Sequence, residues 1–314
     1  MTPRAAVARP GYTATPRMPA APPPDRTVEA RWDRAERRFD FYVEGPHRAT
    51  HALVGALVAV HLLVGVAGPA RLNVWFRLFG PRAEPRLLGW GARGGDAVAS
   101  GEVWRLVSYG FLHWDLVHLL VNAVALFGLG RLAEVVWGPV RLYVLFVVSV
   151  IGGGLLSQTA APDVVSAGAS GGLFGLLGAL VTFGLLRRAK MGPSLADVFV
   201  RRLWPWLVVN LVAGALLPYL YQGGAALLAR AYVAARPLLT PTLGLLPRTV
   251  DFGAGPSLDN RAHVGGLVAG ALAALLLGDR ITDNHAPRPG ATVAMAVTLT
   301  VTLAWAAGMV SLRG

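Results

Sequence analysis

The chain has 314 residues, of which 54% are hydrophobic and 15% charged, and its mean hydropathy is +0.51. These values exclude an ordinary soluble globular protein and indicate a membrane protein. The formal net charge of +12 does not indicate a nucleic-acid surface, because most basic residues lie in tails and between apolar runs. The absence of cysteine excludes disulfides, thiolate catalysis and cysteine-ligated metals.

The N-terminal region is polar before the first apolar stretch begins. Residues 1–30 are rich in proline, alanine and arginine, which predicts a disordered cytoplasmic tail, and they contain no apolar core of a signal peptide. Residues 31–50 alternate arginine with aspartate and glutamate and contain Phe39, Phe41 and Tyr42. This juxtamembrane segment fits either a short helix at the membrane surface or a solvated charged segment.

Seven apolar stretches follow, and they predict an all-α membrane protein. We expect a polytopic helical bundle of six core transmembrane helices plus a seventh, C-terminal one. The core would occupy residues 51–280, and residues 281–314 would form the extra helix. The expected spans are 52–67, 117–136, 140–156, 170–186, 203–221, 262–277 and 291–310.

Two long connections interrupt these spans. Residues 69–104 place aromatic rings next to arginines, which predicts a loop lying at the membrane interface. The insert at about 222–260 begins with an apolar stretch, 223–236, that is too short and too charged to cross a bilayer. We expect an interfacial helix there, ended by prolines.

Basic residues in the short loops predict the orientation. The loop between the fourth and fifth spans contains Arg187, Arg188, Lys190, Arg201 and Arg202, whereas the loop Ser157–Ala167 has no lysine or arginine. The positive-inside rule places the basic loop between the fourth and fifth spans in the cytoplasm. We therefore expect a plasma-membrane protein with a cytoplasmic N-terminus and with the starts of the fourth and sixth spans near the extracytoplasmic face.

Chemistry is suggested first by Ser170 and His263, which stand at the starts of those two spans. Glycines surround Ser170, and Gly266 and Gly270 follow His263 at a spacing of four residues. Small residues let membrane helices approach closely, so we expect the two helices to pack with the imidazole near the hydroxyl. A serine becomes a nucleophile when a positioned base accepts its proton.

The serine motif alone is not specific. In a chain with 38 glycines, Gly168-x-Ser170-Gly171 is also explained by helix packing. The same residues fit the nucleophile elbow of soluble hydrolases, but that motif needs a preceding strand and a parallel sheet, which the apolar spans do not allow.

A second polar group lies on the span 117–136, where His118 and Asn122 share one helix face. A hydrogen bond between helices is one explanation for an asparagine in lipid. The other is an oxyanion hole completed by the Ser170 backbone N–H, with His113 holding the preceding turn. A zinc site made by His113, His118 and His263 is disfavoured because no acidic base accompanies it, and we expect neither a metal nor a cofactor.

Together these residues resemble the rhomboid family of intramembrane serine proteases, over residues 50–280 and in the order of that family. The matching elements are Trp104-Arg105, His113, His118-x-x-x-Asn122, Gly130-Arg131 with Glu134, Gly168-x-Ser170-Gly171 with Phe174, and Ala262-His263-x-x-Gly266-x-x-x-Gly270.

The resemblance implies a nucleophile at Ser170 and a base at His263. It also implies that the residues at His118 and Asn122 hold the oxyanion, and that the Phe174 ring stacks near the histidine. Trp104 and Arg105 would organise the first loop, and Glu134 would support the bundle from inside. The implied partners are transmembrane protein substrates within a lipid bilayer, with no nucleic acid, and the long insert before the sixth span departs from the family pattern.

Two functions of other classes compete with this interpretation. One is a catalytically silent rhomboid-like scaffold that binds membrane proteins, although such relatives lose the serine or the histidine. The other is a transporter, which would need an inverted repeat and buried acidic residues that the sequence does not show. The sequence indicates no oligomeric state.

Overall fold

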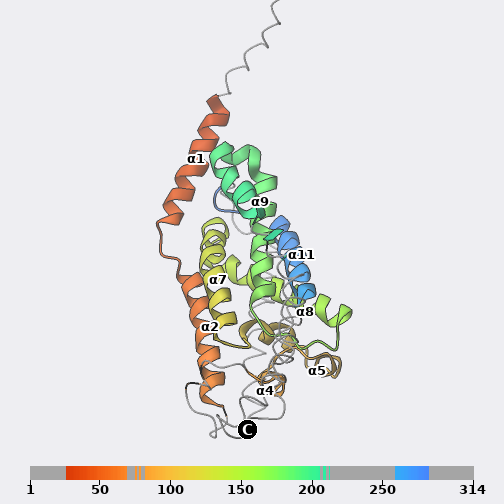
Figure 1. Cartoon of the computed structure of the whole chain (residues 1–314). Helices are drawn as coiled ribbons and strands as arrows, with labels where there is room; N and C mark the ends of the chain where they lie inside the picture. The colour runs from red at the N-terminus through yellow and green to blue at the C-terminus, as the bar shows by residue number, and fades with distance from the viewer. Residues whose placement is uncertain are drawn as a thin grey trace, which may run out of the picture.

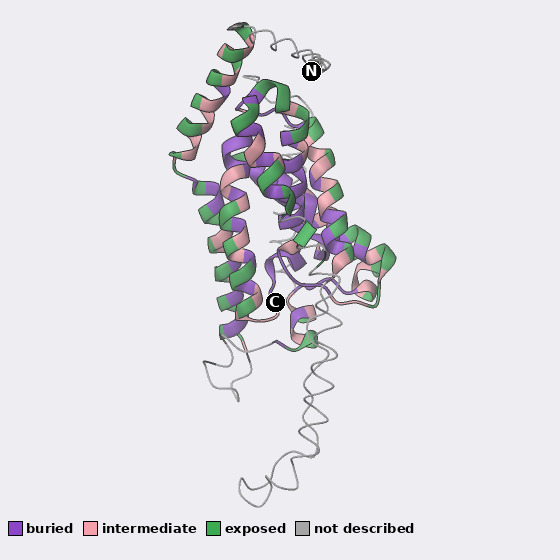
Figure 2. Cartoon of the chain, turned by 45° about the horizontal axis from the view of Figure 1, so that its top comes forward, coloured by how far each residue is buried: buried purple, intermediate pink, exposed green. Residues whose placement is uncertain are grey.

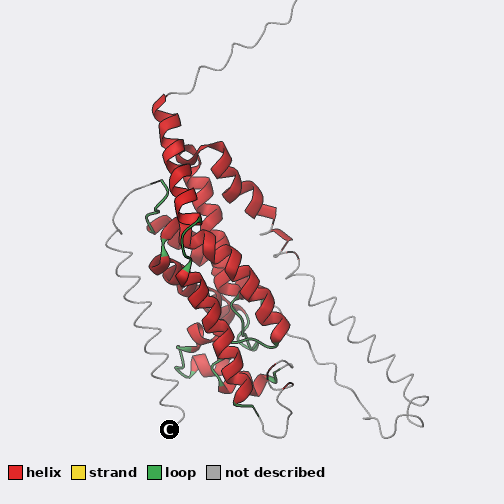
Figure 3. Ribbon diagram, turned by 90° about the vertical axis from the view of Figure 1, so that its left-hand side faces the viewer, coloured by secondary structure: helices red, strands yellow, loops and turns green. Residues whose placement is uncertain are grey.

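The computed structural model describes residues 26–68, 82–205 and 259–282, together with the single positions 75, 78, 208, 209 and 212. Across this part of the chain every regular element is a helix and none is a strand, which confirms the predicted fold class (Figure 3). The seventh expected span, about two thirds of the fifth, the tail up to residue 25 and the insert up to residue 258 lie outside the described residues.

Among the described residues, four stretches are long and apolar enough to cross a membrane. They are α2 (Arg48–Val66), α7 (Leu116–Trp137), α8 (Pro139–Ala160) and the stretch Ser170–Pro205, which begins with α9 (Ser170–Asp197). The shorter apolar helix α11 (Asn260–Leu276) packs alongside α8 and α9 (Figure 1).

The outward faces of these helices are apolar. Figure 2 shows exposed residues along the outer sides of the helices and buried residues in the middle of the bundle. A soluble protein rarely exposes so continuous an apolar surface, so these faces contact lipid and the chain is an integral membrane protein. Examples are Val121, Val124 and Phe127 of α7 and Val264, Val268 and Leu272 of α11.

Two glycines with positive φ interrupt the helical path, one between two helices and one inside a helix. Gly138 has φ +86°, ends α7 and precedes α8, which begins with Pro139, so the predicted break between the second and third spans is confirmed. The fourth span was expected to end near residue 186, which is wrong, because α9 continues to Asp197. Its kink lies at Gly192, where φ is +77° and Pro193 follows. The basic residues between position 186 and the kink, Arg187, Arg188 and Lys190, are good helix formers and do not end a helix.

The charged N-terminal segment forms a helix, α1 (Arg26–Val43), which begins inside the stretch predicted to be disordered. It packs against the C-terminal part of α9 and its continuation η2 (Val198–Arg202), at the end of α9 far from Ser170 (Figure 1). The Trp32 indole donates to the Ala189 carbonyl at 3.0 Å, and the rings of Phe39 and Phe199 meet edge to face. The segment is therefore helical, and whether its charged face meets the membrane surface or solvent stays a prediction.

The connection after α2 contains the short helices α4 (Glu84–Gly89), α5 (Gly95–Ala99), α6 (Arg105–Ser108) and η1 (Tyr109–Phe111). Two arginines of this connection, Arg82 and Arg93, are buried, with exposed fractions of 6% and 0%. That the connection lies at the membrane interface stays a prediction. A buried guanidinium group needs acceptors for its N–H donors, and here backbone carbonyls supply them. Arg82 donates to the carbonyls of His61 and His113, and burial lowers the pKa of Arg82 to about 10.

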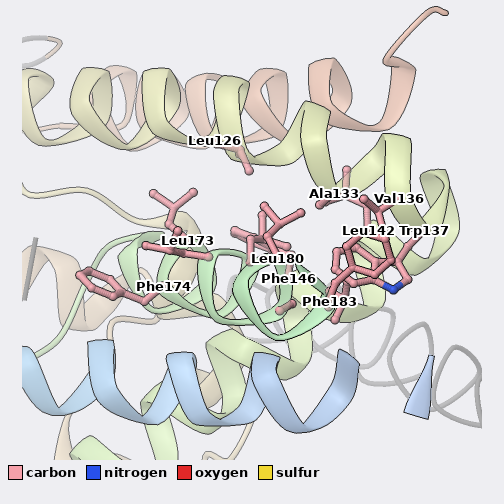
Figure 4. Close-up of a cluster of buried hydrophobic side chains, with 14 of the residues drawn as sticks. Leu126, Ala133, Val136, Trp137, Leu142, Phe146, Leu173, Phe174, Leu180 and Phe183 are labelled. Atoms are coloured by element: carbon pink, nitrogen blue, oxygen red, sulfur yellow. The ribbon is translucent and has the colours of Figure 1, made fainter. Parts of the chain in front are cut away.

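Helix α9 lies at the centre of the bundle. On one side its apolar side chains face α7 and α8, as Figure 4 shows for Leu173, Leu180 and Phe183. On the other side α9 meets α11 almost without side chains. A Cβ added at Gly266 would overlap the Gly171 carbonyl, and a Cβ at Gly270 would overlap the Gly175 carbonyl. The two backbones are therefore in direct contact, and this contact places the starts of α9 and α11 side by side.

Candidate active site

The first residue of α9 and the fourth residue of α11 meet at one end of the bundle. Ser170 Oγ lies 2.8 Å from His263 Nε2, although the two residues are 93 positions apart in the sequence. His263 is only 4% exposed, and Ser170 is half-buried. Both side chains stand at helix starts, so they share one depth in the bundle. The structure thus brings together the two residues that the glycine spacing singled out.

The imidazole ring of His263 is held on two sides. The Phe174 ring, one turn after Ser170, stacks on it with centroids 4.3 Å apart and planes 16° apart. At the far side of the ring, Nδ1 lies 3.2 Å from the Asn260 side-chain oxygen. When Nδ1 carries the proton and donates it to Asn260, Nε2 is left as the acceptor that faces Ser170. Sequence reasoning gave Asn260 no role, although its spacing of three residues from His263 places both on one helix face.

The backbone before Ser170 passes close to His118 and Asn122. Gly168 has φ +148°, and its N–H donates to the Tyr109 carbonyl at 2.9 Å. A Cβ at this position would lie 2.8 Å from His118 Cε1 and 3.8 Å from Asn122 Nδ2. Glycine is needed here both for the backbone angle and for the close approach. The polar face of α7 therefore lies directly beside the start of the serine helix.

Several polar atoms near this point have no hydrogen-bond partner within the described part of the chain. They are Asn122 Nδ2, His118 Nδ1 and both ring nitrogens of His113. The rings of His113 and His118 meet edge to face, with centroids 5.2 Å apart. Burial, followed by the neighbouring His118 and His61, lowers the pKa of His113 well below its usual value, so His113 is neutral at pH 7. Buried donors left unpaired cost about 1–3 kcal/mol each, so this cluster is suited to a polar ligand.

Comparison with known proteins identifies the family. A family model described as the rhomboid domain matches residues 100–280, more than half of the chain. The chain belongs to the rhomboid family. All the residues singled out above, from Trp104 to Gly270, lie within the matched range.

Curated rhomboid relatives match parts of the chain. RHOMBOID-like protein 5 of Arabidopsis thaliana is 41% identical over 107 residues, which are 33% of this chain and 34% of that protein. The rhomboid protease GluP of Bacillus subtilis is 28% identical over 193 residues, 61% of this chain and 29% of its own length. RHOMBOID-like protein 4 of Arabidopsis thaliana is 30% identical over 181 residues, which are 57% of this chain and 35% of that protein. The chain spans about a third of the length of these relatives.

Two predicted residues of the rhomboid domain, Trp104 and Arg105, hold its first loop. The Arg105 guanidinium lies over the Trp104 ring, 4.7 Å from the centroid, and forms an ion pair with Glu102 at 2.7 Å. It also donates to the carbonyls of Leu88 and Ala92 at 2.6 and 2.9 Å. These contacts join α6 to α4 and to the residues that follow α4, and none of them involves Ser170.

Glu134 lies at the other end of α7, inside the rhomboid bundle. Its carboxylate accepts hydrogen bonds from the backbone N–H groups of Ala49 and Thr50 at 3.1 and 2.9 Å, and from the Thr50 hydroxyl at 2.7 Å. The two N–H groups belong to the first turn of α2, where backbone donors have no partner within their own helix, so a buried carboxylate caps that helix. Sequence reasoning placed Glu134 inside the bundle but did not foresee its partner helix.

Across the described residues, no group of three histidine, aspartate or glutamate side chains is arranged to hold a metal ion. His61 is buried on α2, and its Nε2 lies 3.1 Å from the Leu78 carbonyl of the first loop. Sequence reasoning also missed Asp259, whose side chain caps α11 by accepting from the Ala262 N–H at 3.1 Å. An aspartate directly before an apolar helix is a common N-cap, and this pattern could have revealed it.

Proposed function

We propose that this rhomboid family member is an intramembrane serine endopeptidase that cuts peptide bonds in or near transmembrane segments of other membrane proteins. The observation that carries the proposal is the 2.8 Å contact between Ser170 Oγ and His263 Nε2, with the imidazole held by Phe174 and Asn260. A hydroxyl beside an oriented imidazole is the arrangement that activates a serine nucleophile. The match to GluP, which is named a rhomboid protease, supports the same conclusion.

The proposed reaction begins with proton transfer. His263 Nε2 accepts the Ser170 proton while Oγ attacks the carbonyl carbon of the scissile bond, which gives a tetrahedral oxyanion. His263 then donates that proton to the departing amine, and an acyl-enzyme remains on Ser170. In the second half a water molecule, deprotonated by His263, attacks the ester and releases the carboxylic acid, which restores Ser170.

The oxyanion would be held by donors that face the start of α9. Asn122 Nδ2 is buried and unpaired among the described residues, and it lies beside the backbone at Gly168. The Ser170 N–H stands at a helix start, where backbone N–H groups lack helical partners. Together with His118, these groups would stabilise charge that develops in the transition state, each by roughly 10²–10³ in rate.

The proposed substrates are transmembrane helices with small, helix-destabilising residues near the cut. In a helix each carbonyl accepts the N–H four residues later, so the scissile stretch must unwind before a serine can reach it. We further propose that the N-terminus is cytoplasmic and that the active site lies near the extracytoplasmic face of the plasma membrane. The proposed protease core is residues 51–280, followed by an extra C-terminal helix at residues 281–314.

Cleavage of reconstituted transmembrane substrates tests the function. Full-length protein in liposomes should convert a substrate panel into fragments, whereas Ser170→Ala and His263→Ala should give none. Ser149→Ala is the matched control, because Ser149 is a buried serine of α8 that donates only to the Leu145 carbonyl, and this variant should retain cleavage. Binding of the panel without fragments, equal in wild type and Ser170→Ala, would instead support the silent scaffold.

A further inference from the structure

A buried polar cluster joins the chain segments that lead into the two helices of the proposed dyad. Ser166 precedes Ser170 by four residues, and Asp259 precedes His263 by four residues. The Ser166 hydroxyl donates to Asp259 Oδ2. The hydroxyl of Ser157, near the end of α8, donates to the same oxygen. One carboxylate therefore connects α8, the approach to α9 and the start of α11.

Arg93 of the first loop completes this cluster. Its side chain is fully buried, and its guanidinium lies 4.0 Å from Asp259 Oδ2 and donates to the Ser166 hydroxyl at 3.2 Å. The backbones of Arg93 and Ser166 also exchange a pair of hydrogen bonds, at 3.0 and 2.9 Å. Burial lowers the pKa of Arg93, and the Asp259 carboxylate opposes that shift. The remaining guanidinium contacts go to Gln158, Ala161 and Val164.

Such a cluster is costly unless it has a structural role. Burial of each charge carries a large desolvation cost before pairing, and apolar residues of similar size often give equal or better stability. What apolar residues do not give is a fixed geometry, because they pack without directional bonds. At the contact between α9 and α11, glycine stripes bring the backbones together but leave few side chains to define how far one helix slides along the other.

We propose that Asp259, held by Arg93 and Ser166, is a positioning residue that fixes the axial register of α9 and α11 and thereby the approach of Ser170 Oγ to His263 Nε2. Asp259 acts through the first turn of α11, since its other oxygen accepts from the Ala262 N–H at 3.1 Å. The inference rests on the proposed function, because it assigns a role within the same site.

Labelling kinetics with a fluorophosphonate separate positioning from stability. Asp259→Asn keeps the shape of the side chain but removes the charge, and Arg93→Met removes the cation that faces the carboxylate. Each should lower the maximal labelling rate by about 10- to 100-fold, with the half-saturating probe concentration changed by less than about twofold, since displacements near 1 Å suffice for such losses. The double variant should be no slower than either single variant, because the two residues act as one unit.

Asp279→Asn is the matched control for these variants. Asp279 is also a buried aspartate, 3.4 Å from Arg187, but it lies just beyond the opposite end of α11. Its substitution should lower thermal stability and leave the labelling rate of the folded protein unchanged. If Asp259→Asn behaves in the same way, losing stability while keeping its labelling rate, the positioning role is wrong.

A distance measurement tests the register without using activity. Because the chain has no cysteine, Leu185→Cys on α9 and Val264→Cys on α11 introduce two spin-label sites, both at exposed positions. The distance distribution should shift or broaden when Asp259→Asn is added. An unchanged distribution overturns the inference whatever the activity. A wild-type protein that neither reacts with the probe nor cleaves substrate overturns the proposed function, while a broadened distribution still supports the register role.

Discussion

At the scale of single residues, Asn122 shows how the site combines structure with chemistry. An asparagine amide buried in a membrane bundle normally pairs with another helix. In the described part of the chain its Nδ2 has no partner and lies beside the glycine that precedes the serine helix. A donor that is unpaired in the resting site is available when charge develops on a substrate oxygen, which is the behaviour expected of an oxyanion hole.

We therefore expect Asn122→Ala to lower kcat for a transmembrane substrate by roughly 10²–10³, with KM changed by less than about threefold, because the contact forms mainly in the transition state. The measurement is steady-state cleavage in liposomes, with thermal unfolding as a check that the variant is folded. An Asn122→Ala enzyme with the kcat of the wild type would show that the amide does not stabilise the oxyanion.

The sequence predicts some residues of the site better than others. Ser170 and His263 can be predicted because each stands beside a glycine stripe at helical spacing, a pattern that local sequence displays. Arg93 and Asp259 cannot be paired in this way, because their contact depends on a loop folding back against a helix start far along the chain. Asp259 is recognisable only as a helix cap, and the composition of its loop does not reveal that Arg93 is buried.

At the scale of helices, the contact between α9 and α11 decides whether the site exists. The hydropathy pattern predicts where α2, α7, α8 and α11 lie to within a few residues, because lipid requires long apolar helices. It does not predict the extension of α9 past residue 186 or its kink at Gly192. The apolar run ends near residue 186, where basic residues begin, but the helical backbone continues beyond that point.

Gly266→Ala tests this contact. The added Cβ would overlap the Gly171 carbonyl, and backbone atoms cannot move aside as a flexible side chain can. We expect α11 to be displaced from α9, with lower thermal stability and at least about a tenfold loss of cleavage rate. Gly128→Ala on α7 is the control, because nothing lies within 4 Å of a Cβ there, and it should leave both quantities unchanged. Wild-type cleavage by Gly266→Ala would contradict the close packing.

At the scale of the whole molecule, the polar groups divide between the two ends of the bundle. The start of α9, the first loop bound through Arg93, and the start of α11 lie at one end, whereas α1 and the segment 187–190, with Arg187, Arg188 and Lys190, lie toward the other (Figure 1). Under the positive-inside rule this arrangement supports the proposed orientation, in which the serine lies near the extracytoplasmic face.

This orientation predicts the reactivity of single cysteines in intact cells. A membrane-impermeant maleimide should label Ser100→Cys, an exposed position in the first loop, without permeabilisation. Arg188→Cys, exposed near the opposite end of α9, should be labelled only after the membrane is opened. The native chain has no cysteine and supplies the blank. The reverse pattern would place the active site at the cytoplasmic face.

The most direct test of the dyad is mass-spectrometric mapping of a fluorophosphonate adduct on the full-length protein in lipid bilayers. A single adduct on Ser170 is predicted for the wild type, with none in Ser170→Ala and labelling at least about 10³-fold slower in His263→Ala, because an unassisted hydroxyl is a poor nucleophile. An unreacted wild-type protein, an adduct on another serine, or His263→Ala labelled as fast as the wild type would contradict a serine activated by His263.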